Sequence, residues 1–163
     1  MKVNLGAGRQ AYEHSGYVSV DIIPSDGIDY IWDCENGLPK RLDGSGNLIK
    51  VFPDNTVDEF LCRHFLEHIR NLISFIDELW DALKPNGILH IFVPNAECPR
   101  AAWGDPTHVR AFSVISFSYF TKEALVAYPY TDKPWRIDEG YPRINGTPPD
   151  DLWEIEAILR PDK

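Results

Sequence analysis

Apolar residues follow two different periods in the middle of the chain. From residue 72 to residue 83 they recur every three or four positions, which predicts an amphipathic helix that ends at Lys84-Pro85-Asn86-Gly87. Residues 88–93 form a nearly continuous apolar run, which is typical of a strand buried on both faces of a sheet. A helix followed directly by such a strand indicates an α/β protein.

Shorter apolar runs predict the other elements. Strands are expected at residues 2–5, 17–22, 29–32, 57–62, 135–144 and 152–159, a short helix at residues 113–120 and a loop at residues 37–56. Strands separated by crossovers predict a parallel sheet, and the last two strands, joined through residues 145–149, are expected to form an antiparallel pair at its end.

Length and composition predict a single globular domain over residues 1–163. The 163 residues match the usual size of one domain, and 44% of them are apolar. No apolar run is long enough to span a membrane, and the first residues do not form a signal peptide. We therefore expect no membrane association and a cytoplasmic location.

Charge and cysteine content argue against two further classes of protein. The net charge is −9, which disfavours a broad phosphate-binding face and makes nucleic acid an unlikely partner. Cys34, Cys62 and Cys98 are an odd number of widely spaced cysteines, so neither a disulfide framework nor a cysteine zinc site is expected.

A glycine turn follows the first strand. Residues 6–11 read Gly-Ala-Gly-Arg-Gln-Ala, a G-x-G-x-x-G/A pattern that lets a ligand approach the backbone closely, or that serves only as a tight turn. Asp21 ends the second strand, where a carboxylate can bind a ribose diol. A dinucleotide requires its acidic residue about 20 positions after the glycines, whereas Asp21 lies 13 positions after Gly8. The short crossover favours S-adenosylmethionine, which needs no phosphate cradle.

Several motifs, taken in order, resemble class I S-adenosylmethionine-dependent methyltransferases of the small type 11-like group. They are Asn4-Leu-Gly-Ala-Gly8, Val18-Ser-Val-Asp21, residues 52–60, His64-Phe-Leu-Glu-His68, residues 83–87 with 91–94, and Gly104-Asp-Pro-Thr-His108. The resemblance implies a Rossmann-like, seven-stranded, mostly parallel sheet with an antiparallel last strand. The usual helices before the first strand are missing, so the expected N-terminus is minimal.

The resemblance also implies which residues bind S-adenosylmethionine. Its methionine part would lie along Leu5, Gly6, Ala7 and Gly8, and its ribose would be bound by Asp21. Asp33 would lie at the adenine amino group, with Ile22 and Cys34 along the ring. Arg63 and His64 would border the region of methyl transfer.

Residues 64–68 also match the H-x-x-E-H pattern of some zinc hydrolases. In that remote alternative, His64 and His68 would bind zinc and Glu67 would act as the base. No third protein ligand is evident from the sequence, and Glu67 and His68 are expected instead to begin and cap the following helix. We therefore predict no metal site.

The proposed reaction is methyl transfer to a small or medium-sized O or N acceptor. Displacement at a sulfonium needs alignment and exclusion of water more than acid–base catalysis. For a hydroxyl acceptor, His108 is the first candidate base and His64 the second. An alternative function is a non-catalytic, cofactor-binding subunit of a larger assembly, and a second copy of the chain or a partner subunit is expected to cover the site.

Overall fold

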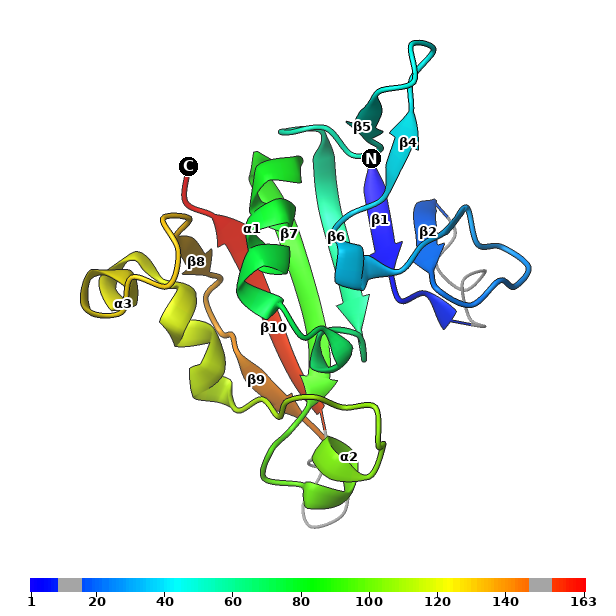
Figure 1. Cartoon of the computed structure of the whole chain (residues 1–163). Helices are drawn as coiled ribbons and strands as arrows, with labels where there is room; N and C mark the ends of the chain where they lie inside the picture. Colours follow the sequence, from blue (N-terminus) through cyan, green and yellow to red (C-terminus); the bar gives the residue numbers. More distant parts are fainter. Residues whose placement is uncertain (9–15, 147–153) are drawn as a thin grey trace.

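A twisted mixed sheet forms the centre of the molecule (Figure 1). The computed structural model describes residues 1–8, 16–146 and 154–163. The strands follow the spatial order β3-β2-β1-β6-β7-β10-β8, and β9 pairs with β10 beside this path. Their bounds are β1 Lys2–Leu5, β2 Tyr17–Asp21, β3 Tyr30–Ile31, β6 Val57–Arg63, β7 Leu83–Pro94, β8 Trp135–Ile137, β9 Arg143–Asn145 and β10 Glu154–Pro161.

The first five strands along this order are parallel. β1 pairs with β2 on one side and with β6 on the other, and β7 continues the sheet parallel to β6. Parallel strands place their carboxyl ends at one edge, so the segments that follow β1, β2, β6 and β7 meet there. This edge carries the candidate site.

The last strands run antiparallel, as the sequence predicts. β10 pairs antiparallel with β7, β8 and β9, so the expected fold class is confirmed. The single strand expected over residues 135–144 is instead two strands, β8 and β9, with a turn at residues 139–140 between them. Antiparallel pairing also places Glu154, the first residue of β10, opposite Pro94, the last residue of β7.

Two boundaries differ from the expectation. The expected loop at residues 37–56 contains a small hairpin of β4 (Lys40–Leu42) and β5 (Leu48–Lys50). β7 begins at Leu83 rather than at residue 88, because Leu83 already pairs with Val57 of β6. Tertiary pairing therefore extends the strand into a segment whose Lys-Pro-Asn-Gly composition predicts a turn.

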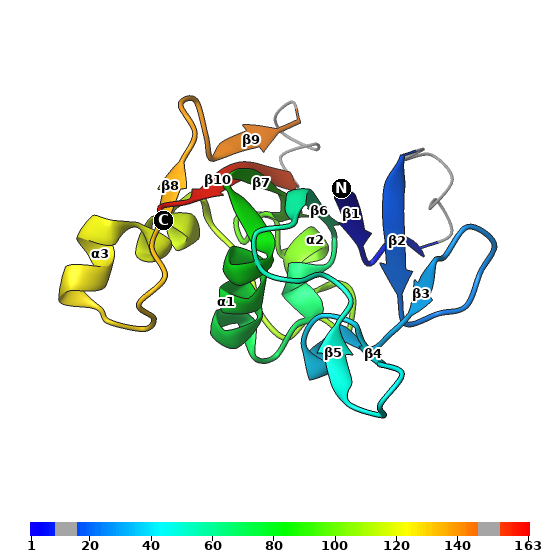
Figure 2. The same cartoon turned by 90° about the horizontal axis from the view of Figure 1, so that it is seen from above.

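The helices described lie on one side of the sheet (Figure 2). Helix α1 (Leu72–Ala82) buries Leu72, Phe75, Ile76, Leu79 and Ala82 against it, which confirms the predicted amphipathic helix. The shorter helices are α2 (Pro99–Trp103), α3 (Lys122–Ala127) and the 3-10 segments η2 (Cys34–Asn36), η3 (Leu66–His68) and η4 (Val114–Phe120). No helix in the described ranges is long and apolar enough to cross a membrane.

Between β7, β9 and β10 lies a cluster of polar side chains, the Glu156 cluster, formed by His90, Arg143, Asn145 and Glu156. Glu156 accepts hydrogen bonds from Arg143 Nε at 2.8 Å and from Asn145 Nδ2 at 3.0 Å, and His90 Nε2 lies 2.8 Å from its other oxygen. Although burial opposes ionisation, these bonds lower the pKa of Glu156. The cluster joins three strands and leaves both carboxylate oxygens paired.

Candidate functional site

The glycine turn lies between the carboxyl ends of β1 and β2. Gly6 and Gly8 have φ angles of +68° and +60°, which L side chains rarely adopt. The amides of Gly6 and Ala7 donate to Val20 O at 2.9 and 3.1 Å, which closes the turn onto β2. A Cβ on Gly6 would lie 2.5 Å from Phe65 Cδ2, so this glycine also permits close packing of the Phe65 ring.

Asp21 is held in place by backbone amides. Its Oδ2 accepts the N–H of Gly8 at 2.8 Å, and its Oδ1 accepts the N–H of Ile23 at 2.7 Å. The two bonds orient the carboxylate at the end of β2 and leave further lone pairs for a ligand. A fixed carboxylate beside a glycine turn suits a ribose diol. Arg9, Gln10 and Ala11 of the motif lie outside the described residues.

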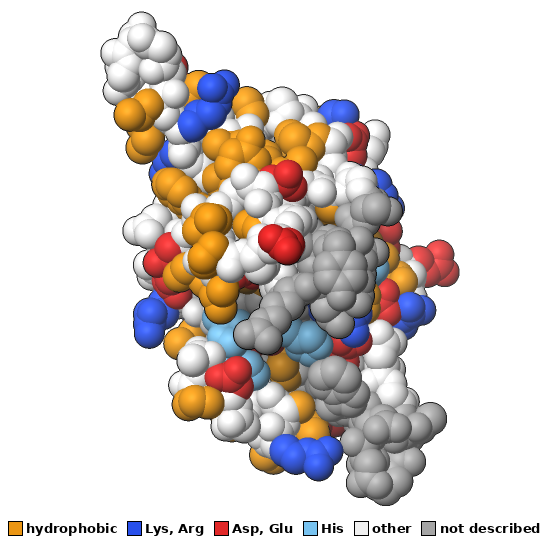
Figure 3. All heavy atoms as spheres, turned by 90° about the vertical axis from the view of Figure 1, so that its right-hand side faces the viewer, with side chains coloured by type: hydrophobic (Ala, Val, Ile, Leu, Met, Phe, Trp, Pro, Cys, Tyr) orange, Lys and Arg blue, Asp and Glu red, His pale blue; other side chains and the backbone are white. Residues whose placement is uncertain are grey.

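These features open onto one cavity of about 710 Å³, a volume typical of small-molecule sites. Six of the predicted site residues line it: Gly6, Asp21, Ile22, Asp33, Cys34 and His64. The cavity is also lined by Phe65, His68, Ile69, Arg70, Pro106, Thr107 and Val109, among others. Figure 3 shows histidine and hydrophobic side chains exposed on the face that carries the β2 edge of the sheet.

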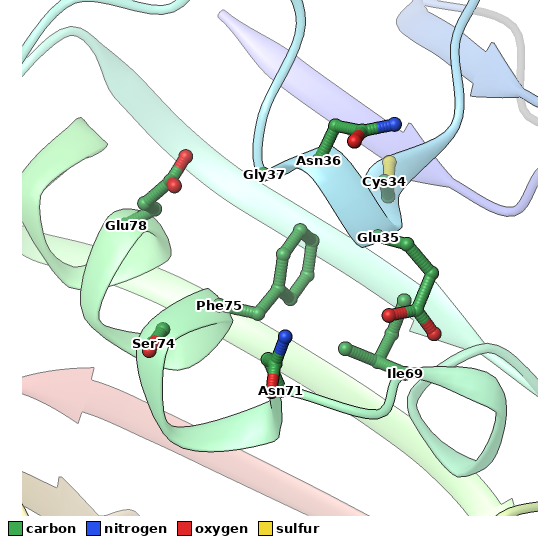
Figure 4. A pocket seen from close by; sticks show the side chains of 9 residues that line it. All are labelled: Cys34, Glu35, Asn36, Gly37, Ile69, Asn71, Ser74, Phe75 and Glu78. Carbon is green, nitrogen blue, oxygen red and sulfur yellow. The ribbon is translucent and has the colours of Figure 1, made fainter.

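A smaller cavity of about 310 Å³ adjoins the first and shares Cys34, Glu35 and Ile69 with it. Figure 4 shows it between η2 and α1, with Phe75 projecting between the two elements. Asp33 caps η2 by accepting the N–H of Glu35 at 3.0 Å. Burial raises the pKa of the Cys34 thiol to about 12, so Cys34 can contribute a neutral surface to this region but not a thiolate.

His64 follows β6 with a φ of 51°, in the left-handed region. Its Nε2 lies 3.0 Å from Glu154 Oε2, and its Nδ1 lies 3.5 Å from Glu67 Oε1. These carboxylates raise the pKa of His64 to about 9. In this arrangement the imidazole carries its proton at neutral pH, which does not suit the role of general base that the sequence led us to assign to His64.

Five predicted residues do not line the cavity, and two of them, Ala7 and Gly8, belong to the glycine turn itself. Leu5 is fully buried in the core, and the Arg63 guanidinium lies 3.0 Å from Glu154 and stacks over the Phe92 ring. His108, the first candidate base, has a side chain that is only 7% exposed. Its Nδ1 donates to the carbonyl of Ala102 at 2.8 Å, so only Nε2 is left to interact with another group.

The segment after β7 is tied to the segment after β6. The N–H of Val109 donates to the carbonyl of Glu67 at 2.9 Å, and Arg110 Nη2 donates to the carbonyls of Ile69 and Arg70 at 2.8 and 2.6 Å. The two segments are therefore fixed relative to each other. This places His108 against His68, with ring centroids 4.8 Å apart.

Glu67, His68 and His108 form a second polar cluster, the Glu67 cluster. One ligand atom from each residue lies within 4.8 Å of the others. Glu67 and His68 belong to η3 and do not begin α1, which starts at Leu72 after its N-cap residue Asn71. The expectation that they begin and cap the following helix is therefore wrong, because the chain makes a 3-10 turn first.

Sequence reasoning missed two acidic residues of β10 and the hydroxyl of Thr107. Glu154 and Glu156 are each 5% exposed and contact residues of β6, β7 and β9. Both lie in a strand that is otherwise apolar. Their alternation with Ile155 and Ala157 was the signal in the sequence that they share one face of that strand. Thr107 Oγ1 lies 3.0 Å from His68 Nδ1, a contact between segments 39 residues apart.

Comparison with known proteins identifies similar domains. The family model described as "Methyltransferase domain" matches residues 11–128. A search of curated proteins finds no match to this chain. Among solved structures, an S-adenosylmethionine-dependent methyltransferase from Archaeoglobus fulgidus is 15% identical with a TM-score of 0.54, and the alignment covers 98% of this chain and 85% of that one.

Two further structures are similar at the same level. The 1,6-didemethyltoxoflavin-N1-methyltransferase of Burkholderia thailandensis, solved with 1,6-didemethyltoxoflavin and S-adenosylhomocysteine, is 16% identical with a TM-score of 0.60, covering 99% and 71% of the two chains. An S-adenosylmethionine-dependent methyltransferase from Aquifex aeolicus is 15% identical with a TM-score of 0.51, covering 97% and 80%. At these identities the likeness concerns the fold.

Proposed function

This chain belongs to the family of methyltransferase domains, and from this premise we propose that it transfers a methyl group from S-adenosylmethionine to a small or medium-sized O or N acceptor. The family expected from the sequence, the class I S-adenosylmethionine-dependent methyltransferases, is confirmed. Family membership also favours methyl transfer over the hydrolase alternative.

One observation carries the proposal: the glycine turn and the amide-held Asp21 carboxylate open onto the same cavity. The residues present fit the cofactor. Apart from its chain neighbours, no atom of the described residues lies within 4 Å of the position of a Cβ on Gly8, which leaves room for a ligand on that side of the turn. The methionine part would lie along Gly6 and Gly8, and Asp21 would bind the ribose. Ile22, Asp33 and Cys34 would line the adenine region.

The other wall of the cavity would receive the acceptor. It is lined by His64, His68, Pro106, Thr107 and Val109, which follow β6 and β7. S-adenosylmethionine supplies an electrophilic methyl group when bound. The chain's own task is to hold the acceptor in line with that group and to exclude water. Because β6 and β7 lie side by side and the segments after them are joined by hydrogen bonds from Val109 and Arg110, these segments form one wall that can fix this alignment.

Calorimetric titration with S-adenosylhomocysteine tests the cofactor assignment. Asp21→Asn keeps the size of the side chain but removes its charge, and we expect it to weaken binding at least tenfold because hydrogen bonds to charged acceptors are the stronger ones. Asp58→Asn is the matched control, because Asp58 pairs with the N-terminus and Lys84, away from the cavity. Equal affinity in Asp21→Asn and the unmodified chain would contradict the assignment.

The alternative of a non-catalytic partner subunit has its own support. Ile22 and Ile23, at the rim of the cavity, are 58% and 65% exposed, as if another chain covered them. We propose that a second copy of the chain or a partner subunit binds at this rim. We also propose that the protein acts in the cytoplasm, and that its substrate is a small molecule and not nucleic acid. Light scattering with and without S-adenosylhomocysteine measures self-association, and turnover by the isolated chain would exclude the purely non-catalytic role.

A further inference from the structure

We propose that the Glu67 cluster binds one divalent transition-metal ion through Glu67, His68 and His108. A third ligand for the H-x-x-E-H motif was not evident in the sequence. The fold supplies it from the segment after β7, because that segment lies beside the one after β6. The three ligands differ from the His64, Glu67 and His68 set of the hydrolase alternative.

The first argument is the state of Glu67. Its side chain is only 1% exposed, and neither carboxylate oxygen has a hydrogen-bond partner among the residues described. The nearest basic atoms are His64 Nδ1 at 3.5 Å and His108 Nε2 at 3.9 Å. A buried carboxylate without hydrogen bonds is costly and is rarely retained without a reason. The ion pair with His64 leaves both oxygens without an ordinary hydrogen bond, and a cation bound between Glu67, His68 and His108 would supply that contact.

The second argument is that both histidines are oriented by hydrogen bonds through Nδ1. His108 Nδ1 donates to the carbonyl of Ala102 at 2.8 Å. Thr107 Oγ1 donates its own proton to Asp105 Oδ1 at 2.6 Å, so at 3.0 Å from His68 Nδ1 it acts as the acceptor. In neutral imidazoles this arrangement leaves the Nε2 lone pair of each ring free. Metal-binding histidines almost always donate their other N–H in this way.

The third argument is geometric. The three ligand atoms lie within 4.8 Å of one another. Ligands at about 2.0–2.1 Å from a tetrahedral ion lie roughly 3.3 Å apart, so side-chain shifts of about 1 Å would close the site. Three protein ligands with an open position are typical of catalytic metal sites. Two imidazoles and one carboxylate favour Zn²⁺ or Co²⁺ over Mg²⁺ or Ca²⁺.

The ion would lie in the cavity wall, because His68 and the neighbouring Thr107 line the cavity. An open coordination position there would bind an oxygen atom of the methyl acceptor. This orientation toward the acceptor rests on the proposed function, whereas binding of the ion does not.

Equilibrium dialysis of the whole chain against Zn²⁺, followed by elemental analysis, tests the site. We expect one ion per chain, and loss of affinity of at least 100-fold in Glu67→Gln and in His68→Ala. His90→Ala is the matched control, since His90 belongs to the Glu156 cluster, and we expect it to bind Zn²⁺ normally. No stoichiometric Zn²⁺ in folded protein, or equal binding by all variants, would overturn the proposal.

Cobalt(II) provides a second readout that does not depend on turnover. We expect absorption bands of a Co²⁺ site with nitrogen and oxygen ligands, and a change in these bands when acetohydroxamate, an oxygen ligand, is added. Bands that persist in His108→Ala would overturn the ligand set, and bands insensitive to acetohydroxamate would overturn the open position. S-adenosylhomocysteine binding is measured separately, so failure of the metal site and failure of the proposed function are distinguishable.

Discussion

Two polar clusters, each built around a buried glutamate with a histidine beside it, differ in whether the carboxylate is satisfied by hydrogen bonds. In the Glu156 cluster, Glu156 is paired with His90, Arg143 and Asn145, all within hydrogen-bond distance. In the Glu67 cluster, the histidine nitrogens nearest to Glu67 lie 3.5 and 3.9 Å away and make no hydrogen bond that satisfies it. The first carboxylate is satisfied by its own strands and holds them together. The second has unused capacity to bind a ligand.

The difference follows from where the clusters lie. Glu156 is in the middle of β10, paired with β7 and β9, where cross-strand neighbours are fixed by register. Glu67 lies in a turn after β6, where the approach of a second loop sets its surroundings. Loops that meet at the carboxyl edge of a parallel sheet are where ligands bind in this class of fold.

Exchanging one residue in each cluster is the strongest test of this contrast. Glu67→Gln is expected to lose Zn²⁺ affinity at least 100-fold, while Glu156→Gln retains it. Glu156→Gln is expected to lower the stability by roughly 2 kcal/mol, less than for a fully buried pair because Arg143 is 54% exposed. That corresponds to a fall of about 4–8 °C in Tm. Zinc binding and thermal unfolding are measured for both variants. Loss of Zn²⁺ binding in Glu156→Gln would contradict the claim that only the Glu67 cluster binds the ion.

A smaller effect is expected from the hydrogen bond that orients His68. Thr107→Val removes the acceptor of the His68 Nδ1 proton but leaves all three proposed ligands. Such changes beside a metal site cost about 10–100-fold in affinity, and we expect about tenfold here because Thr107 is exposed. Zn²⁺ titration compares Thr107→Val with the control Thr131→Val, because the hydroxyl of Thr131 contacts Asp77 and not a proposed ligand. Unchanged affinity in Thr107→Val would show that this hydroxyl does not orient a ligand.

The smallest effect concerns pH. The pKa of Glu156 in the folded protein lies below its ordinary value of 4.5, so its stabilising contribution is present above about pH 4.5 and is lost as the pH falls through the folded pKa. We therefore expect the stability difference between the unmodified chain and Glu156→Gln to shrink between pH 6 and pH 3. Urea unfolding at several pH values measures it. Glu139→Gln, at an exposed position, is the control that should show little difference at any pH.

Much of the fold could be predicted from periodicity. The helix at Leu72–Ala82 and the strands at Lys2–Leu5 and Val57–Arg63 appear close to their expected bounds, because their apolar spacing matches what each element buries. The break between β8 and β9 and the β4–β5 hairpin were missed. In those segments strand pairing and turns, and not local hydrophobicity, decide the conformation.

The candidate site was predictable only in part. Gly6, Asp21 and Cys34 line the cavity, as the motifs led us to expect, while Leu5, Ala7, Gly8, Arg63 and His108 do not. The position of His108 depends on the 107–110 segment being tied to the 67–70 segment by hydrogen bonds from Val109 and Arg110. No local pattern encodes those bonds, so the sequence placed His108 at the acceptor instead of beside His68.

The sequence by itself determined the α/β class, the glycine turn and the acidic residue after the second strand, because each depends on residues close together in the chain. Only the tertiary structure decided which polar groups share a site. Glu67 and His108 are separated in the chain by α1, β7 and α2, and they meet because β6 and β7 are parallel neighbours whose carboxyl ends lie at one edge. Glu154 reaches the same edge because β10 runs in the opposite direction.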